Sequence, residues 1–151
     1  MAHSIVENYL HIIFSTKYRS VPIHSSLEER LYSYIVGISK QKNVTILRIN
    51  GTDDHIHILL KLHPSVALAD LIRDYKSYST AWIKKNGFPN FAWQIGYGGF
   101  SYCRSLLKSV MNYIDNQKEH HKTHSLRDEV EMLKKQWGID WEWHPPEDQS
   151  P

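Results

Sequence analysis

Apolar residues along the chain follow two periods, one typical of strands and the other of helices. Stretches rich in β-branched and aromatic residues predict strands, and apolar side chains that recur every three to four residues predict helices. The expected elements are a strand at 9–18, a helix at 25–42, strands at 44–50 and 55–62, a helix at 65–86, an irregular edge strand and loop at 91–102, and helices at 103–121 and 125–137. This β-α-β-β-α-β order predicts an α+β fold, a ferredoxin-like (RRM-like) antiparallel sheet with helices packed on it, plus C-terminal helices.

Two of the element ends carry residues with a defined local geometry. Asn50-Gly51 predicts a tight turn, so the strands on either side of it should form a hairpin with a short acidic loop. Ser125, followed three residues later by Asp128, matches a helix capping box.

The length of 151 residues fits one domain, taken here as 1–151, with residues 139–151 expected to form a tail outside the core. No apolar run approaches the ~20 residues that a membrane span needs, and the first residues lack the pattern of a signal peptide. The single cysteine, Cys103, excludes an intrachain disulfide and fits a reducing cytoplasm. The net charge of +2 is too small to indicate nucleic-acid binding by itself.

Two histidines in the third predicted strand form the sharpest local feature. Because the side chains of a strand alternate between its faces, His55 and His57 point to the same side, about 6.6 Å apart at the backbone. Ile56 and Ile58 then point into the core. Two imidazoles on one face of a stiff strand can share a divalent cation. Two surface histidines on a polar strand face would give the same pattern, so the spacing alone leaves both interpretations open.

Tyr113 and Gln117 lie four residues apart in a predicted helix and are therefore neighbours on one helical face. They flank an apolar stripe and can face a groove, but a tyrosine at the edge of the core beside a solvated glutamine gives the same pattern. His120 and His124 share this spacing and suggest another metal site, although a polar helix end accounts for them equally well.

Basic and hydroxyl side chains form a stripe along the second predicted helix. Arg73, Lys76 and Lys84 fall on one face, opposite the apolar residues. Such a stripe can follow a phosphate backbone, and Lys17 and Arg19 are further candidate phosphate contacts. A merely solvated helix face would look the same.

Four sequence stretches carry a resemblance to a known family. They are His11–Arg19 (HIIFSTKYR), Asp53–Leu59 (DDHIHIL), Phe91–Ser101 (FAWQIGYGGFS) and Tyr113–His121 (YIDNQKEHH). Together, and in this order, they resemble the single-tyrosine transposases of small bacterial insertion sequences, a group within the HUH superfamily that includes the REP-associated tyrosine transposases. The resemblance extends from Tyr9 to about Gly138.

The resemblance implies a role for each matching residue. Tyr113 matches the nucleophile, His55 and His57 match the metal-binding pair, and Gln117 matches the residue that completes the metal site. The implied ion is Mg²⁺, or Mn²⁺, which two imidazoles suit better. The implied activity is metal-dependent cleavage and rejoining of single-stranded DNA through a 5′-phosphotyrosine intermediate, with hairpins at the ends of a mobile element as the recognised structure.

The resemblance also implies an assembly and a location. Family members are twofold homodimers in which the tyrosine helix of one subunit completes the histidine pair of the other. The expected location is the bacterial cytoplasm, with no membrane partner.

A second class of function remains open, namely a noncatalytic or domesticated nucleic-acid-binding module with the same fold, because fold alone does not decide function. An RNA-recognition module would display stacking aromatic residues on an open sheet face. Here that face is expected to carry His55 and His57, which favours catalysis.

Overall fold

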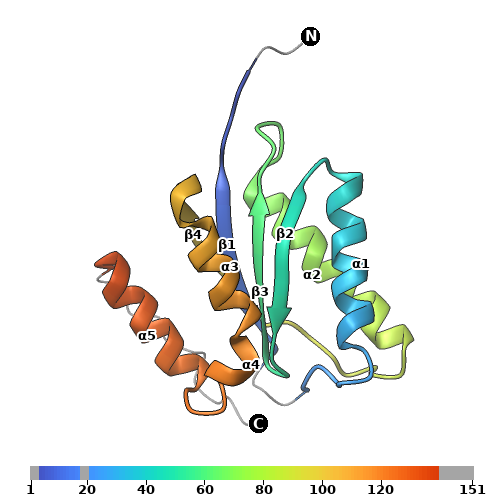
Figure 1. Ribbon diagram of the computed structural model, residues 1–151. Coiled ribbons are helices and arrows are strands. Elements are labelled where there is room, and N and C mark those ends of the chain that lie inside the picture. Colours follow the sequence, from blue (N-terminus) through green and yellow to red (C-terminus); the bar gives the residue numbers. More distant parts are fainter. Residues whose placement is uncertain (1–3, 18–20, 140–151) are drawn as a thin grey trace.

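The chain folds into one antiparallel sheet with helices on both of its faces (Figure 1). The computed structural model describes residues 4–17 and 21–139. The strands are β1 (Tyr9–Ser15), β2 (Thr45–Gly51), β3 (His55–Lys61) and β4 (Gly98–Tyr102), and the helices are α1 (Glu28–Gln41), α2 (Leu68–Lys85), the 3-10 helix η2 (Arg104–Leu106), α3 (Leu107–Asp115), α4 (Gln117–His120) and α5 (Leu126–Trp137). The strand order is β2-β3-β1-β4, and each neighbouring pair is antiparallel. The predicted ferredoxin-like fold with additional C-terminal helices is therefore confirmed.

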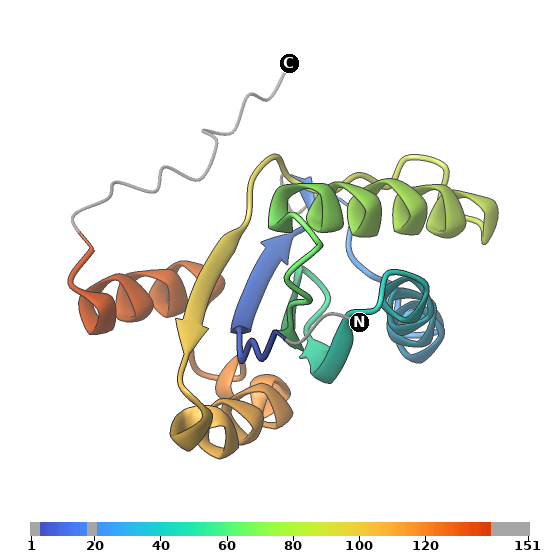
Figure 2. The ribbon, with the colours of Figure 1, turned by 90° about the horizontal axis from the view of Figure 1, so that it is seen from above.

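Side chains alternate along β1 and β3 and so reach the two faces of the sheet in turn. On one face, Ile12, Ile56 and Ile58 are buried in the main core together with apolar residues of α1 and α2. On the other face, Leu59 packs with Ile114 of α3, and a smaller cluster lies beneath α5. Figure 2 shows α2 and α3 on opposite sides of the sheet. The histidines of β3 alternate with its isoleucines and therefore lie on the face covered by α3 and α5.

Strands β2 and β3 form the expected hairpin, but Asn50 and Gly51 belong to β2 and not to the turn. The chain reverses at residues 52–54 instead. A Cβ atom on Gly51 would lie 2.2 Å from the carbonyl oxygen of His55. The close approach of two backbone segments therefore requires glycine at this position, and the prediction of a tight turn at Asn50-Gly51 is wrong.

The third predicted helix is divided into η2, α3 and α4. The side-chain amide of Asn50 donates hydrogen bonds to the carbonyl oxygens of Ile114 at 2.9 Å and Asp115 at 3.3 Å. A side chain that binds carbonyl groups inside a helical ladder favours a local break, and α3 and α4 meet at Asn116. The break places Gln117, which is fully buried, at the start of α4.

Helix α5 lies over β1 and β4 on the same face of the sheet as α3. It begins with the predicted capping box, in which the Ser125 and Asp128 side chains each accept a hydrogen bond from the other residue's backbone N–H. It ends at Gly138 in the left-handed conformation, with φ of 62°. None of the helices in the described ranges combines the length and apolar character that a membrane crossing needs. The expected tail falls outside the described residues from position 140 onward.

Candidate active site

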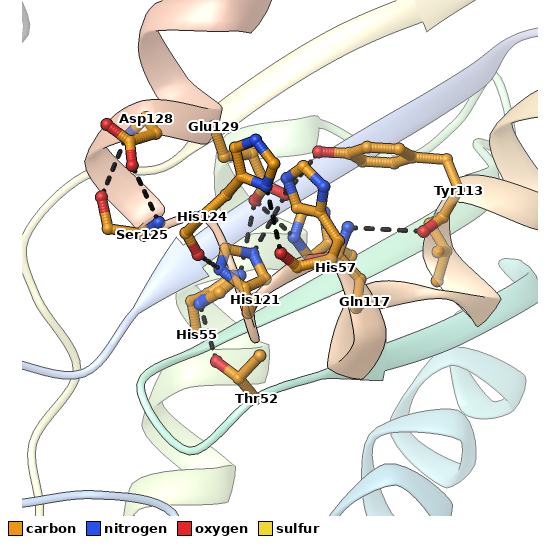
Figure 3. Close-up of polar contacts among 12 residues, drawn as sticks. Thr52, His55, His57, Tyr113, Gln117, His121, His124, Ser125, Asp128 and Glu129 are labelled. Carbon is orange, nitrogen blue, oxygen red and sulfur yellow. Dashed lines mark hydrogen bonds and ion pairs between the residues drawn. The ribbon is translucent and has the colours of Figure 1, made fainter.

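His55 and His57 extend from β3 to the same side of the sheet, as predicted. Both are fully buried, and their ring centroids lie 5.0 Å apart. Figure 3 shows both imidazoles directed toward the carboxylate of Glu129, which comes from α5. Their burial excludes the interpretation of two surface histidines on a polar strand face.

A neighbouring side chain holds the Nδ1 atom of each of these histidines. Nδ1 of His55 lies 2.5 Å from Oδ1 of Asp54 and 2.9 Å from Oγ1 of Thr52. Nδ1 of His57 lies 2.7 Å from Nε2 of His11, and the two rings stack with centroids 5.0 Å apart. Both members of the pair therefore turn Nε2 toward a common space, which is how protein histidines are commonly oriented around a metal ion.

Tyr113 and Gln117 lie beside the histidine pair of their own chain (Figure 3). The Tyr113 ring is 5.9 Å from the His57 ring, nearly perpendicular to it, and its hydroxyl donates a hydrogen bond to Glu129. Nε2 of Gln117 donates to the carbonyl oxygen of Tyr113 at 3.4 Å, while Oε1 is buried without a hydrogen-bond partner among the described residues. The fold thus gathers the four site residues that the sequence singled out.

Glu129 of α5 is the site residue that the sequence reasoning missed. Its Oε1 lies 2.8 Å from Nε2 of His57 and 3.4 Å from Nε2 of His55. Its Oε2 lies 3.1 Å from Nε2 of His121 and accepts the hydrogen bond of the Tyr113 hydroxyl. One fully buried carboxylate therefore contacts the histidine pair, a third histidine and the tyrosine.

The sequence of α5 did contain a signal for Glu129. Leu126, Val130 and Leu133 lie on one face of the helix, and Glu129 falls within that apolar face at helical spacing. A carboxylate on a buried face requires polar partners. The sequence does not say which partners these are, because they come from other elements.

His120 and His124 are arranged differently from the metal site suggested for them. Their rings stack face to face with centroids 4.7 Å apart. Within the part of the chain that the structure describes, the candidate metal-binding group contains His121 instead.

This group consists of His55, His57, His121 and Glu129, and its ligand atoms all lie within 4.8 Å of one another. Imidazole nitrogens and carboxylate oxygens are suitable ligands for divalent ions. Nε2 of His55, Nε2 of His57 and Oε1 of Glu129 are buried, and although Nε2 of His57 approaches Oε1 to 2.8 Å, none of the three atoms makes a well-aligned hydrogen bond among the described residues. Buried polar atoms normally have partners, so these residues fit the divalent cation that the resemblance implies.

Burial and mutual contacts shift the pKa values in this cluster in different directions. Burial lowers the pKa of His57 to about 4 and that of His11 to about 3. Burial acts in the same direction on His55, but the carboxylates of Asp54 and Glu129 outweigh it and raise the pKa of His55 to about 9. Burial alone would raise the pKa of Glu129, whereas its contacts with His55 and His57 hold it well below the usual range. At pH 7 the metal-free cluster therefore contains an anionic Glu129, a neutral His57 and a protonated His55, and His55 must lose its proton before it can bind an ion.

The residues suggested as DNA contacts are spread over several parts of the structure. Arg73 is exposed and pairs with two aspartates of α2. Lys76 instead turns its Nζ onto backbone carbonyl oxygens of the loop before β4, at 2.8 and 2.5 Å, and burial lowers its pKa to about 8. Lys84 and Lys17 are exposed, and Arg19 lies outside the described residues.

A cleft of about 600 Å³ borders the histidine cluster, between the loop of the β2–β3 hairpin and the turn from α4 to α5. Its walls include His121, which belongs to the cluster, and Asp54, which contacts His55. Lys118 and Lys122 also line it. The cleft therefore joins the solvent to one side of the cluster, and its walls carry the acidic side chains of Glu28 and Asp53 as well as the two lysines.

Comparisons with known proteins agree with this fold. The model of a family described as IS200-like transposases matches residues 4–117. The transposase of insertion sequence element IS200 from Salmonella typhimurium is 26% identical over 129 residues, which cover 81% of this chain and 84% of that protein. The ISDra2 transposase TnpA of Deinococcus radiodurans is 21% identical over 116 residues, which cover 72% of this chain and 83% of that protein.

A solved structure of a REP-associated tyrosine transposase bound to a REP hairpin has a similar fold. Its TM-score is 0.63 and its sequence identity is 14%, with 95% of this chain and 90% of that chain covered. The fold, the order of the site residues and the family match over most of the chain lead to one assignment. This chain belongs to the family of IS200-like transposases.

Proposed function

We propose that this transposase cuts and rejoins single-stranded DNA by covalent catalysis, with Tyr113 as the nucleophile. His55, His57 and Gln117 are the proposed ligands of a divalent ion, Mg²⁺ or Mn²⁺. The observation that carries the proposal is the place of the Tyr113 hydroxyl, which enters the buried cluster beside the histidine pair of its own chain. A tyrosine with a purely structural role in the core does not need its hydroxyl next to a cluster of side chains that can bind a metal ion.

In the proposed reaction, the Tyr113 oxygen forms a bond to the scissile phosphorus while the bond from phosphorus to the 3′ oxygen breaks. The products are a 5′-phosphotyrosine and a free 3′-hydroxyl, and the proton that the tyrosine loses is balanced by the one that the 3′ oxygen gains. A divalent ion bound at the histidine pair would polarise the phosphate and offset its charge. Because the phosphotyrosine bond retains the energy of the broken bond, the 3′-hydroxyl of a second strand can reverse the step without ATP.

The proton of the Tyr113 hydroxyl has an acceptor within the cluster. Burial and the contact with Glu129 raise the pKa of Tyr113 above its ordinary value, so the hydroxyl is protonated before the attack. Its hydrogen bond to the Glu129 carboxylate orients the oxygen and provides a path for the proton. No general base was evident from the sequence. Because its own pKa is held well below the usual range, Glu129 is too weak a base to keep the proton, and its proposed role is to orient the hydroxyl and pass the proton on.

The proposed substrate is single-stranded DNA, with hairpins at the ends of an element as the recognised structure. The fold is similar to that of a REP-associated tyrosine transposase that was solved with a REP hairpin. Lys118 and Lys122 line the cleft beside the cluster, and Lys17 and Lys84 offer exposed positive charge that can contact phosphates. The proposed location is the bacterial cytoplasm, where a protein that acts on the bacterial DNA would meet its substrate.

A noncatalytic nucleic-acid module is the competing candidate, and the sheet argues against it. Single-stranded RNA binds RNA-recognition modules by stacking on aromatic residues of an open sheet face. Here the corresponding face is packed against α3 and α5, and its histidines are buried. A domesticated enzyme that cleaves hairpins without moving an element would use the same site and is a variant of the proposed function.

The test is the formation of a covalent adduct. The protein is incubated with Mg²⁺ or Mn²⁺ and single-stranded DNA from the ends of its own genetic locus, and a denaturation-resistant protein–DNA band is sought. The Tyr113→Phe variant removes only the hydroxyl and should form no adduct, whereas Tyr102→Phe, a tyrosine of β4, should form it normally. An adduct of normal yield with Tyr113→Phe would show that another residue is the nucleophile.

A twofold homodimer with shared active sites is a further part of the proposal. The chain places Tyr113 beside its own histidine pair, so sharing requires the tyrosine helix to move to the partner. The test is complementation between a Tyr113→Phe subunit and a subunit with both His55 and His57 replaced by alanine. Cleavage should reappear in the heterodimer if sites are shared, and a mixture that forms heterodimers yet stays inactive would show that each chain builds its own site.

A further inference from the structure

We propose that the ion bound by the histidine pair is also held by His121 and Glu129, two residues that follow the tyrosine helix. The inference rests on the proposed function for the role of the ion, but its evidence is the geometry of the cluster. Both residues lie beyond position 117, where the match to the family model ends. The family assignment therefore does not by itself imply their participation.

The four ligand atoms are close enough to surround one ion. Nε2 of His57 lies 2.8 Å from Oε1 of Glu129, and the ligand atoms of the four residues all lie within 4.8 Å of one another. Ligands about 2.1 Å from a tetrahedral ion lie roughly 3.4 Å from one another, which is below this limit, and such an ion can expand to a fifth ligand, here an oxygen of the scissile phosphate. Two ligands come from β3 and two from the segment that contains the α4–α5 turn, so the ion would join the sheet to the C-terminal helix.

Each of the three imidazoles is oriented for ligation through Nε2. Nδ1 of His55 contacts the Asp54 carboxylate, and Nδ1 of His57 contacts His11. Nδ1 of His121 donates to the carbonyl oxygen of His124 at 2.7 Å. A donated Nδ1 proton leaves the lone pair on Nε2, and this is the usual arrangement of metal-binding histidines and their supporting groups.

The two oxygens of the Glu129 carboxylate face different groups. Oε1 approaches the histidine pair and is buried without a hydrogen-bond partner among the described residues, as are the facing Nε2 atoms of His55 and His57. Oε2 accepts the hydrogen bond of the Tyr113 hydroxyl and lies 3.1 Å from Nε2 of His121. A cation between Oε1 and the two imidazoles would satisfy all three atoms, and the same carboxylate would fix the distance between the ion and the nucleophile.

This set of ligands also indicates the kind of ion. Three imidazoles and one carboxylate favour a divalent transition ion such as Mn²⁺, Co²⁺ or Zn²⁺ over Mg²⁺, which prefers oxygen ligands and retains water. The sequence implied Gln117 as the residue that completes the site. Its Nε2 donates to the backbone of Tyr113, while its Oε1 is buried without a hydrogen-bond partner among the described residues. His121 and Glu129 are therefore proposed as ligands in addition to the histidine pair, and Oε1 of Gln117 stays available to the same ion.

The experiment is a titration of the metal-free, full-length protein with Co²⁺ alone, followed by visible absorption and calorimetry. The wild type should bind one equivalent with the absorption of a low-coordinate cobalt site. Glu129→Gln and His121→Ala should each lower the Co²⁺ affinity at least tenfold and change the spectrum. The matched controls are Glu131→Gln, an exposed glutamate of the same helix, and His124→Ala, which leaves the carbonyl group that His121 uses. Both should bind Co²⁺ as the wild type does.

Circular dichroism of every variant separates the loss of a ligand from the loss of the fold, and His121→Ala provides the test if Glu129→Gln is unfolded. Wild-type affinity and spectrum in folded Glu129→Gln or His121→Ala would overturn the inference for that residue.

A variant with both His55 and His57 replaced by alanine distinguishes the two proposals. If that variant alone loses Co²⁺, the histidine pair binds the ion as proposed for the function and the additional ligands are wrong. If it also binds normally, or if the wild type binds no Co²⁺, both proposals fail.

Discussion

Replacing His11 with phenylalanine should weaken metal binding even though His11 is not itself a proposed ligand. The residue is buried in β1, 1% exposed, and its Nε2 lies 2.7 Å from Nδ1 of His57. Burial lowers the pKa of His11 to about 3, so the ring is neutral at pH 7 and can accept the Nδ1 proton of His57. That proton must be on Nδ1 for Nε2 of His57 to bind an ion. Phenylalanine retains a stacked ring but removes the acceptor.

The expected size of the effect follows from these contacts. Loss of a supporting hydrogen bond to a metal-binding histidine lowers metal affinity by about 10- to 100-fold, which is about 1.4–2.7 kcal/mol. The Nδ1 group of His57 would also remain buried without a partner, at a cost of about 1–3 kcal/mol in stability. For a domain of this size, each kcal/mol lowers Tm by roughly 2–4 °C.

The assay is calorimetric titration with Mn²⁺, accompanied by thermal unfolding of the metal-free protein. His11→Gln serves as the second variant, because its side-chain oxygen can accept the same proton. We expect His11→Gln to recover part of the Mn²⁺ affinity that His11→Phe loses. If both folded variants bind Mn²⁺ equally well, or if His11→Phe binds it like the wild type, then His11 only fills space and does not orient His57.

Three further predictions concern the ion, its protons and the core. DNA cleavage should stop in a chelator and return with Mn²⁺ or Mg²⁺, and cleavage that persists in the chelator would remove the metal from the mechanism. Because His55 has a pKa of about 9, metal binding at pH 7.5 should release close to one proton, and the release should fall as the pH rises above 9 and the free site is already deprotonated. Calorimetry in buffers of different ionisation enthalpy measures this release, and identical heats in all buffers would contradict it. Leu59→Ala empties a fully buried position between β3 and α3 and should cost about 2–5 kcal/mol of unfolding free energy in urea denaturation, whereas a loss under 1 kcal/mol would mean that the face beneath α3 is loosely packed.

The sequence by itself determined the order of strands and helices and part of the site. Alternation along a strand is a local property, so the pattern of residues 55–60 was enough to place His55 and His57 on one face and the isoleucines between them in the core. The capping box at Ser125 was likewise readable, because its two hydrogen bonds involve residues three apart. Helical spacing alone predicts that Tyr113 and Gln117 are neighbours. They remain neighbours although the helix breaks at Asn116 between them.

Only the tertiary structure decided what surrounds these residues. Glu129 lies 72 positions after His57 in the chain, yet its carboxylate is 2.8 Å from that imidazole, because α5 folds back over the face of the sheet that carries the histidines. The role of Gly51 also depends on a contact with another strand, the carbonyl oxygen of His55, and not on a turn conformation. A local sequence pattern predicts the face of an element to which a side chain points, because that depends only on the backbone of the same element. Which residues meet on that face depends on how separate elements pack, and many different partners are compatible with the same pattern of burial.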